Sequence, residues 1–183
     1  MKQALVIIDV QNDYFPEGKF ALVNTESTLK NVLKLQQYFR LKQLPIYYIQ
    51  HTKSDPNANF FVKGSNGAEI HSSLLPVNDL HEYIIEKNFP NSFYQTNLQQ
   101  KLQQESIEQL VLCGMMSHMC VDSTTRYACE LGYQPILIHN ACTTRDLEFN
   151  DQILPAQMVH NGFMSALTGF ASVISADAFI HMK

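Results

Sequence analysis

Several features are missing from this chain of 183 residues. It has no tryptophan and only four cysteines, none of them in a CxxC pair. Unpaired cysteines favour reduced thiols in a cytosolic setting, and a chain that can bury a core this large has no need of a disulfide framework. The apolar run before Asp9 covers only residues 4–8, too short for a signal-peptide core or a membrane span. We therefore expect a cytoplasmic protein with no membrane partner.

Basic residues are also scarce. Lysine and arginine number 13 against 17 acidic residues, for a net charge of -4, and they are scattered along the chain. Because binding to phosphates needs clustered basic residues, nucleic acid is not expected as a partner. No glycine-rich loop follows the first apolar run, which argues against a nucleotide-binding protein. A small-molecule substrate is the expected partner.

What the sequence does contain is a series of short, unbroken apolar runs. They cover residues 4–8, 45–49, 83–85, 109–113, 135–138 and 171–174. Unbroken runs of this length are typical of strands buried on both faces, as in parallel sheets. Segments with helical spacing stand between most of them, at residues 27–42, 95–108, 118–131 and 151–167. The alternation predicts an α/β fold with a six-stranded, mainly parallel sheet covered by helices on both faces.

We see no linker and no repeat, so one domain is expected over residues 1–183. Residues 51–82 are the irregular part, with prolines and glycines and little periodicity. A loop of this length in a compact domain is usually functional. It is therefore a candidate lid or pocket wall.

Three residues that could carry chemistry stand where predicted strands end: Asp9, Lys87 and the Cys120 region. Sites in parallel sheets form beyond the carboxyl ends of the strands. Each residue also has a plainer interpretation. Asp9 could cap a turn, Lys87 could be a solvated strand end, and Cys120 could be a packing residue. Together they would supply a nucleophile, an acid/base and a countercharge.

Cys120 is the best placed of the four cysteines. It stands in the first turn of a predicted helix, where free N–H groups, the helix dipole and a nearby cation would lower the pKa of a thiol. Cys113 lies inside a predicted strand, and Cys129 lies nine residues after Cys120, on the opposite helix face. Cys142 is expected in a loop after the fifth run. Position favours Cys120 as the nucleophile.

Three separated motifs then carry a resemblance that extends over almost the whole chain. They are Asp9 to Tyr14 (DVQNDY), Lys87 with Ser92, Phe93 and Thr96, and Gly114 with Cys120, Val121, Thr124, Arg126 and Ala128. In these motifs the chain resembles the isochorismatase-like cysteine hydrolases. That family includes nicotinamidases, N-carbamoylsarcosine amidohydrolase and ureidoacrylate amidohydrolase.

The resemblance implies a Rossmann-like three-layer α/β/α sandwich and a catalytic triad of Asp9, Lys87 and Cys120. It also implies a non-proline cis peptide bond between Met115 and Met116, and an oxyanion hole made by the backbone N–H groups of Met116 and Cys120. The implied reaction is thiolate attack on the carbonyl carbon of a C–N bond, with an acyl-enzyme that water hydrolyses. Homo-oligomers, dimers or larger, are implied by analogy.

One departure from the family concerns the metal. Nicotinamidases carry an Asp-x-His…His set after the second strand, where this chain has Ile49, Gln50 and His51. Because the aspartate is missing, we expect no metal and no other cofactor, and nicotinamidase activity is not favoured. Candidate substrate-binding residues are Gln11, Phe15, His51 and Tyr94.

We therefore expect a cysteine-dependent hydrolase that cleaves a C–N bond of a small amide, carbamoyl or ureido compound. Two alternatives stay open. One is an isochorismatase-type hydrolase of a vinyl ether, and the other is a non-catalytic member of the fold that only binds a small molecule.

Overall fold

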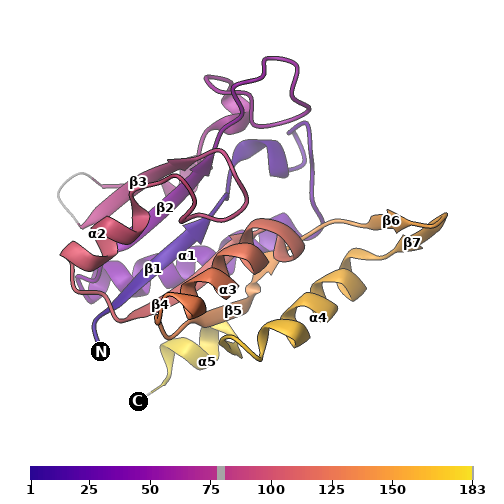
Figure 1. Ribbon diagram of the computed structural model, residues 1–183. Helices are drawn as coiled ribbons and strands as arrows, with labels where there is room; N and C mark the ends of the chain where they lie inside the picture. The colour runs from indigo at the N-terminus through magenta and orange to yellow at the C-terminus, as the bar shows by residue number, and fades with distance from the viewer. Residues whose placement is uncertain (78–80, 183) are drawn as a thin grey trace.

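The computed structural model describes residues 1–77 and 81–182 (Figure 1). The irregular segment predicted for residues 51–82 is described except at positions 78–80, which lie outside these ranges, as does residue 183. It contains the short 3-10 helices η2 (Asn66–Ala68) and η3 (Ser72–Leu74). None of the described helices is long and apolar enough to cross a membrane.

One sheet of six strands organises the chain, and every neighbouring pair in it is parallel. The predicted parallel sheet is therefore confirmed. In spatial order its strands are β3 (Glu82–Lys87), β2 (Ile46–His51), β1 (Gln3–Ile8), β4 (Gln109–Met115), β5 (Ile136–Thr143) and β8 (Ser172–Ile174).

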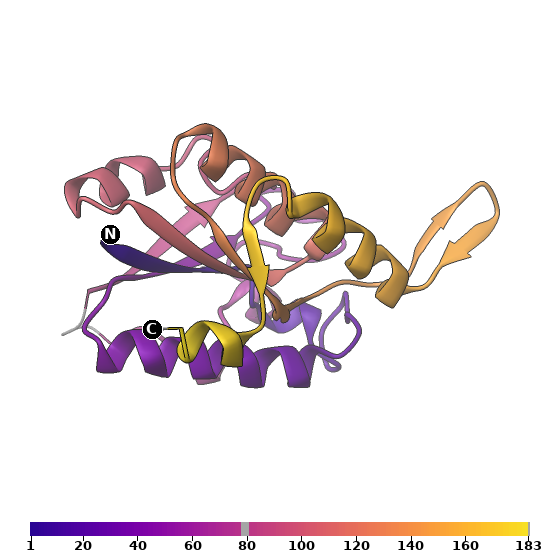
Figure 2. The same ribbon diagram turned by 90° about the horizontal axis from the view of Figure 1, so that it is seen from below.

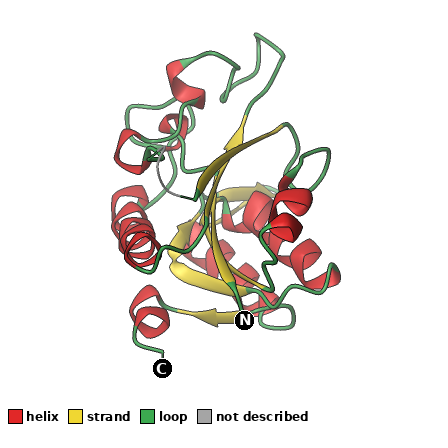
Figure 3. Cartoon of the chain, turned by 90° about the vertical axis from the view of Figure 1, so that its left-hand side faces the viewer, coloured by secondary structure: helices red, strands yellow, loops and turns green. Residues whose placement is uncertain are grey.

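Helices cover both faces of this sheet, as predicted (Figures 2 and 3). They are α1 (Thr25–Leu41), α2 (Leu98–Gln104), α3 (Asp122–Glu130), α4 (Ala156–Leu167) and α5 (Ala176–Ile180). Figure 2 shows α1 and α5 on one face and α2, α3 and α4 on the other. The buried residues Leu29, Val32, Leu35 and Phe39 recur along α1 at intervals of three or four, which gives the helix one apolar face against the sheet.

β1 lies at the centre of the core because it is apolar on both faces. From Ala4 to Ile8 no residue is more than 2% exposed. Each large apolar side chain buried in this way stabilises the fold by roughly 1.5–3 kcal/mol. Since β1 is paired with β2 on one side and β4 on the other, the residue that follows it enters the middle of the molecule.

The strand order creates a switch point between β1 and β4. From β1 the chain builds outward through β2 and β3, then returns to the other side of β1 with β4 and continues through β5 to β8. In sheets of this kind ligands bind beyond the carboxyl ends of the strands at such a point. The register sets Ile8 opposite both Ile49 and Gly114, so the ends of β1, β2 and β4 lie side by side.

Two predictions near the C-terminus are wrong. The segment 151–155 is not helical: β6 (Leu147–Phe149) and β7 (Gln152–Leu154) form an antiparallel hairpin, and α4 begins only at Ala156, after Pro155. Asn150 and Asp151 both have positive φ, at 51° and 58°, as a two-residue hairpin turn requires. Cys142 lies inside β5 and not in a loop, because β5 continues to Thr143.

Candidate active site

Asp9 is the first residue after β1 and is completely buried. Its backbone is in the left-handed region, with φ of 52°, and its N–H donates to the Ile49 carbonyl of β2 at 3.1 Å. Oδ1 of its carboxylate has no hydrogen-bond partner among the described residues. A buried carboxylate with an oxygen left free is costly to keep, but it is available to accept a proton.

Lys87 supplies the countercharge. It ends β3, in register with His51 of β2, and is 1% exposed, so it is not a solvated strand end. Its Nζ lies 2.9 Å from Oδ2 of Asp9 and donates to the Pro90 carbonyl at 2.9 Å. Despite burial, which favours the neutral forms of both groups, the pair holds the pKa of Asp9 below and that of Lys87 above its ordinary value.

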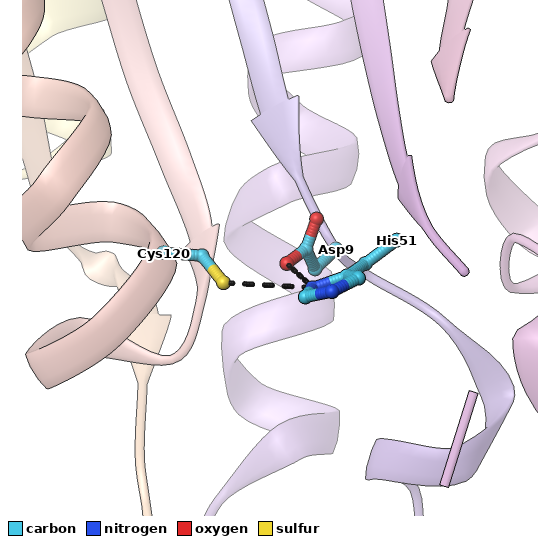
Figure 4. Close-up of side chains that lie close together, drawn as sticks. All are labelled: Asp9, His51 and Cys120. Atoms are coloured by element: carbon cyan, nitrogen blue, oxygen red, sulfur yellow. Dashed lines mark hydrogen bonds and ion pairs between the residues drawn. The ribbon is translucent and has the colours of Figure 1, made fainter. Parts of the chain in front are cut away.

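Cys120 lies beside this ion pair. It belongs to η4 (Ser117–Val121), a single π-helical turn between β4 and α3, and is 3% exposed. Figure 4 shows Asp9, His51 and Cys120 converging, with Nδ1 of His51 3.5 Å from Oδ2 of Asp9 and 3.9 Å from Sγ of Cys120. The structure therefore brings the three predicted triad residues and His51 together.

The predicted lowering of the Cys120 pKa is wrong for the resting protein. Burial raises the pKa of this thiol well above its ordinary value, and the negative charge of Asp9 raises it further. Lys87 acts in the opposite direction but does not outweigh them. Burial and Asp9 thus favour the neutral form of the Cys120 thiol, whereas the ion pair favours the charged forms of Asp9 and Lys87.

The turn that presents Cys120 has an unusual start. The Met115–Met116 peptide bond is cis, and the Met116 carbonyl accepts from the N–H groups of Met119 and Val121 at 3.1 and 3.2 Å. Gly114, just before it, has φ of +126°, and a Cβ there would lie 2.0 Å from the Ile8 carbonyl oxygen. Only glycine lets β4 approach β1 this closely. We call residues 116–121, which carry the predicted nucleophile Cys120, the nucleophile turn.

Two histidine contacts anchor the nucleophile turn, and neither was predicted. Ser117 Oγ shares a hydrogen bond of 2.8 Å with Nδ1 of His160 on α4. His118 Nδ1 is hydrogen-bonded to Oγ1 of Thr144, just after β5. The partners are 43 and 26 positions away in the chain, so no local pattern could have identified them. They fix the turn to α4 and to the end of β5.

Gln11, a predicted substrate-binding residue, has another role in this structure. Its Oε1 accepts from the His51 N–H at 2.8 Å, and its Nε2 donates to the carbonyls of His51 at 2.8 Å and Ala68 at 2.7 Å. The side chain thus pairs with the end of β2 as a further strand would. Because the amide is engaged with the backbone, we assign Gln11 to positioning His51.

The other predicted binding residues lie differently. Phe15 is 6% exposed and packs against His71, with ring centroids 4.3 Å apart, at a cavity of about 730 Å³ that no triad residue lines. Tyr94 is 51% exposed and packs edge-on against Phe89. Within the described residues, no hydrogen bond joins Tyr94 to the triad. Of the four, His51 has its ring Nδ1 3.5 Å from the Asp9 carboxylate and 3.9 Å from Sγ of Cys120.

Two cations near the site were not predicted from the sequence. Arg145 directly follows Thr144, the partner of His118, and lies 5.0 Å from the Phe20 ring. Its Nε is buried and has no hydrogen-bond partner among the described residues, whereas its Nη1 donates to the Asp146 carbonyl at 3.2 Å. Within the described part of the chain no carboxylate lies within 4 Å of the guanidinium. Lys53, 3.5 Å from the Phe60 ring, is close enough for Cys120 to influence its pKa, which burial lowers. The rings of Phe20 and Phe60 stack on each other, so the two cations lie against one pair of stacked aromatic rings.

Asp9, His51 and Cys120 could also be considered as metal ligands, since their ligand atoms lie within 4.8 Å of one another. Lys87 opposes this use, because its ammonium already lies 2.9 Å from the carboxylate and would repel a divalent cation. The donor set fits a nucleophile with a charged partner better than it fits a metal ion.

Comparisons with known proteins agree with this geometry. A family model described as the isochorismatase domain matches residues 3–176. An isochorismatase family protein of Bacillus subtilis, YddQ, is 46% identical over 181 residues, 98% of this chain and 99% of that protein. A solved structure of an isochorismatase hydrolase from Oleispira antarctica is 43% identical, with a TM-score of 0.93, and the match covers 99% of this chain and 97% of that one. N-carbamoylsarcosine amidase from Thermoplasma acidophilum is 26% identical, with a TM-score of 0.80 and coverage of 97% and 98%.

The ion pair leads to a stability prediction. Lys87→Met leaves the Asp9 carboxylate buried without its cation, so the free energy of unfolding in urea should fall by about 3–5 kcal/mol at pH 7. Lys34→Met removes an exposed pair with Asp177 and should cost at most about 1 kcal/mol. Equal losses in the two variants would contradict a stabilising buried pair.

The difference in unfolding free energy between Lys87→Met and the parent should depend on pH. Because folding lowers the pKa of Asp9, the stability it contributes is present above its ordinary value of 3.8 and disappears as pH falls through the folded value. The raised pKa of Lys87 acts conversely: its contribution is lost as pH rises through a value above 10.5. The Lys87→Met deficit should therefore be largest between these limits and shrink outside them.

The raised pKa of the Cys120 thiol gives a second prediction. Alkylation by iodoacetamide, followed on the Cys120 peptide by mass spectrometry, should keep accelerating into the alkaline range, with no plateau near neutrality. Asp9→Asn removes the negative charge that raises this pKa and should speed labelling at pH 8. Cys129, which is partly exposed, serves as the internal reference. A plateau below pH 7 would mean a resting thiolate and contradict the assignment.

Proposed function

Because this chain belongs to the isochorismatase family, whose members are generally hydrolases, we propose that it is a cysteine hydrolase that cleaves a C–N bond of a small amide, carbamoyl or ureido compound. The observation that carries the proposal is the cluster of Cys120, Asp9 and Lys87, buried together at the switch point of the sheet. A thiol, a free carboxylate oxygen and a fixed cation are what acyl transfer through sulfur requires.

In the first half of the reaction Sγ of Cys120 attacks the carbonyl carbon while Asp9 accepts the thiol proton. The C–N bond then breaks, and Asp9 returns the proton to the leaving nitrogen, which departs as ammonia or an amine. A thioester on Cys120 remains. Lys87 keeps the total charge of the site near neutral throughout, because its cation balances the negative charge whether it lies on Asp9 or on sulfur.

In the second half a water molecule attacks the thioester carbonyl, and Asp9 again accepts a proton. The C–S bond breaks, sulfur regains a proton from Asp9, and the acid product leaves. The backbone N–H groups of Met116 and Cys120 are the proposed oxyanion donors, since both belong to the nucleophile turn. His51, held by Gln11, faces both Asp9 and Cys120 and is proposed to orient the two groups that exchange the proton.

The cations beside the site suggest a substrate with a negative charge. Arg145 is half-buried and has no acidic partner in the described part of the chain, whereas Arg40 and Arg126 each pair with a carboxylate. A guanidinium binds a carboxylate through two parallel hydrogen bonds. We propose that Arg145 receives a carboxylate of the substrate while Cys120 reacts with its amide or carbamoyl carbon.

The amide assignment has support from the likeness to N-carbamoylsarcosine amidase. Vinyl ether hydrolysis needs no attack by sulfur on a carbonyl, so it would leave the buried thiol beside Asp9 without a use. For the same reason a protein that only binds a small molecule is not favoured, since both the ion pair and the free carboxylate oxygen would be costly features without a reaction.

The proposal predicts that Cys120→Ser lowers kcat by at least about 10³-fold on any amide that the protein hydrolyses. Ammonia or amine release from a panel of amides, carbamoyl and ureido compounds, with isochorismate included, is the measurement. Cys129→Ser makes the same change on a residue of α3 outside the site and should stay within about twofold of the parent. Turnover that survives in Cys120→Ser, or hydrolysis of isochorismate alone, would contradict the proposal.

The role of Arg145 predicts a split between KM and kcat. Arg145→Gln should raise KM for carboxylate-bearing substrates by about 10- to 100-fold, because losing a hydrogen bond to a charged group weakens binding by about that factor. The kcat should change little. For neutral amides of the same panel both constants should stay unchanged. Arg126→Gln, which removes the guanidinium paired with Asp122, is the matched control. A loss that is equal for charged and neutral substrates would contradict recognition by charge.

A further inference from the structure

Tyr14 is a buried residue that takes no part in the proposed reaction. It ends η1 (Asn12–Tyr14), the 3-10 turn that follows the end of β1, and it is 1% exposed. Its N–H donates to the Gln11 carbonyl at 3.1 Å, and its carbonyl accepts from the Leu22 N–H at 2.9 Å. The backbone is thus fixed on both sides, and one of the two partners is the residue that positions His51.

Three phenylalanine rings hold the Tyr14 ring in place. Its centroid lies 4.6, 5.8 and 6.2 Å from those of Phe61, Phe60 and Phe20. The Phe61 ring is also next to His51, with centroids 5.9 Å apart. The Phe20 ring is the one against which Arg145 lies. Tyr14 therefore stands between the side of the site that holds His51 and the cation proposed to bind the substrate.

The Tyr14 hydroxyl has no hydrogen-bond partner among the described residues, although a buried hydroxyl is costly to leave unpaired. The Tyr47 hydroxyl, on β2, also lacks a partner in the described part of the chain, but its oxygen is completely enclosed. The Tyr14 oxygen is not enclosed in this way, so the small exposed part of the residue includes its hydroxyl. What distinguishes Tyr14 is therefore an oxygen that a ligand can reach.

The charges of the site surround this hydroxyl. Asp9, Cys120 and Arg145 are all close enough to influence its pKa. Burial and the negative charge of Asp9 raise the pKa of Tyr14 well above its ordinary value, so the hydroxyl keeps its proton at neutral pH. A phenolic O–H that stays protonated is a hydrogen-bond donor. The partner that would satisfy it is an acceptor oxygen.

A substrate carboxylate at Arg145 supplies such an acceptor. Nη1 of the guanidinium donates to the Asp146 carbonyl at 3.2 Å, which leaves its other N–H groups for a carboxylate. A carboxylate has about four lone-pair sites, so two bonds from the guanidinium leave others free. The reacting carbonyl of the substrate, by contrast, already has proposed donors in the nucleophile turn.

We propose that Tyr14 is a specificity-determining residue, whose hydroxyl donates a hydrogen bond to the same substrate carboxylate that Arg145 receives. The inference rests on the proposed function, which assigns that carboxylate to the substrate. Because the phenylalanine rings hold the donor in place before the substrate arrives, little freedom is lost on binding. The hydroxyl carries no charge, so it binds the carboxylate without competing with Lys87 for Asp9.

Binding of small amides to the Cys120→Ser protein, measured by titration calorimetry, tests this contact without turnover. The probes are oxamate, malonamate, succinamate and N-carbamoylglycine, which carry a carboxylate, and propionamide and butyramide, which do not. In this background Tyr14→Phe should raise Kd for the tightest carboxylate by about 10- to 100-fold, because a hydrogen bond to a charged group is lost. Binding of the neutral amides should not change. Since the hydroxyl has no partner in the described fold, the variant should unfold at the same urea concentration as its parent.

Tyr47→Phe is the matched control, because it removes a buried, unpaired hydroxyl from the middle of β2, outside the site. It should bind every probe as the parent does. A double-mutant cycle then tests whether the two donors share one carboxylate. Adding Tyr14→Phe to Arg145→Gln should weaken carboxylate binding by at most about threefold, because residues that act on one group are not additive.

Four results would overturn the inference: unchanged carboxylate binding in Tyr14→Phe, equal losses for carboxylates and neutral amides, full additivity with Arg145→Gln, or a parent that binds none of the carboxylates. The hydrolase proposal is judged separately, by amide turnover in the protein with Cys120 intact. A chain that binds carboxylates through Tyr14 but hydrolyses no amide would support this contact and refute the proposed activity. Turnover that depends on Cys120, with carboxylate binding indifferent to Tyr14, would do the reverse.

Discussion

The ion pair between Lys87 and Asp9 is the interaction on which the site depends. Its partners come from β3 and β1, which are not neighbours, because β2 lies between them. Burying either charge alone would cost several kcal/mol, so the register of three strands has to bring them together. The pair then sets the charge around Cys120. The negative charge of Asp9 raises the pKa of the Cys120 thiol, and the positive charge of Lys87 lowers it.

The second constraint is the switch point between β1 and β4. There Gly114 allows β4 to approach the Ile8 carbonyl, and the nucleophile turn begins directly afterwards. The turn has no regular helix of its own to hold it and relies on hydrogen bonds to His160 and Thr144. Thr144 precedes the β6–β7 hairpin and His160 follows it, so both anchors come from the C-terminal part of the chain.

Much of the fold could be predicted from the sequence. Strands buried on both faces must be apolar without a break, so all six strands of the main sheet were visible as runs. The motifs around Asp9, Lys87 and Cys120 identified the residues that converge. The β6–β7 hairpin was missed because the helical spacing of α4 seemed to continue back to residue 151. Three-residue strands, formed around two residues with positive φ, leave too short a pattern to detect.

The sequence by itself determined the order of elements and the types of residue at the strand ends, since both follow from local periodicity and spacing. Only the tertiary structure decided what those residues are. It made Lys87 a buried cation, engaged the Gln11 amide with the backbone of His51 and Ala68, and raised the pKa of the Cys120 thiol against the expectation from its helix-start position. The reason is physical: burial and Coulomb interactions depend on distances between residues far apart in the chain, and only folding sets those distances.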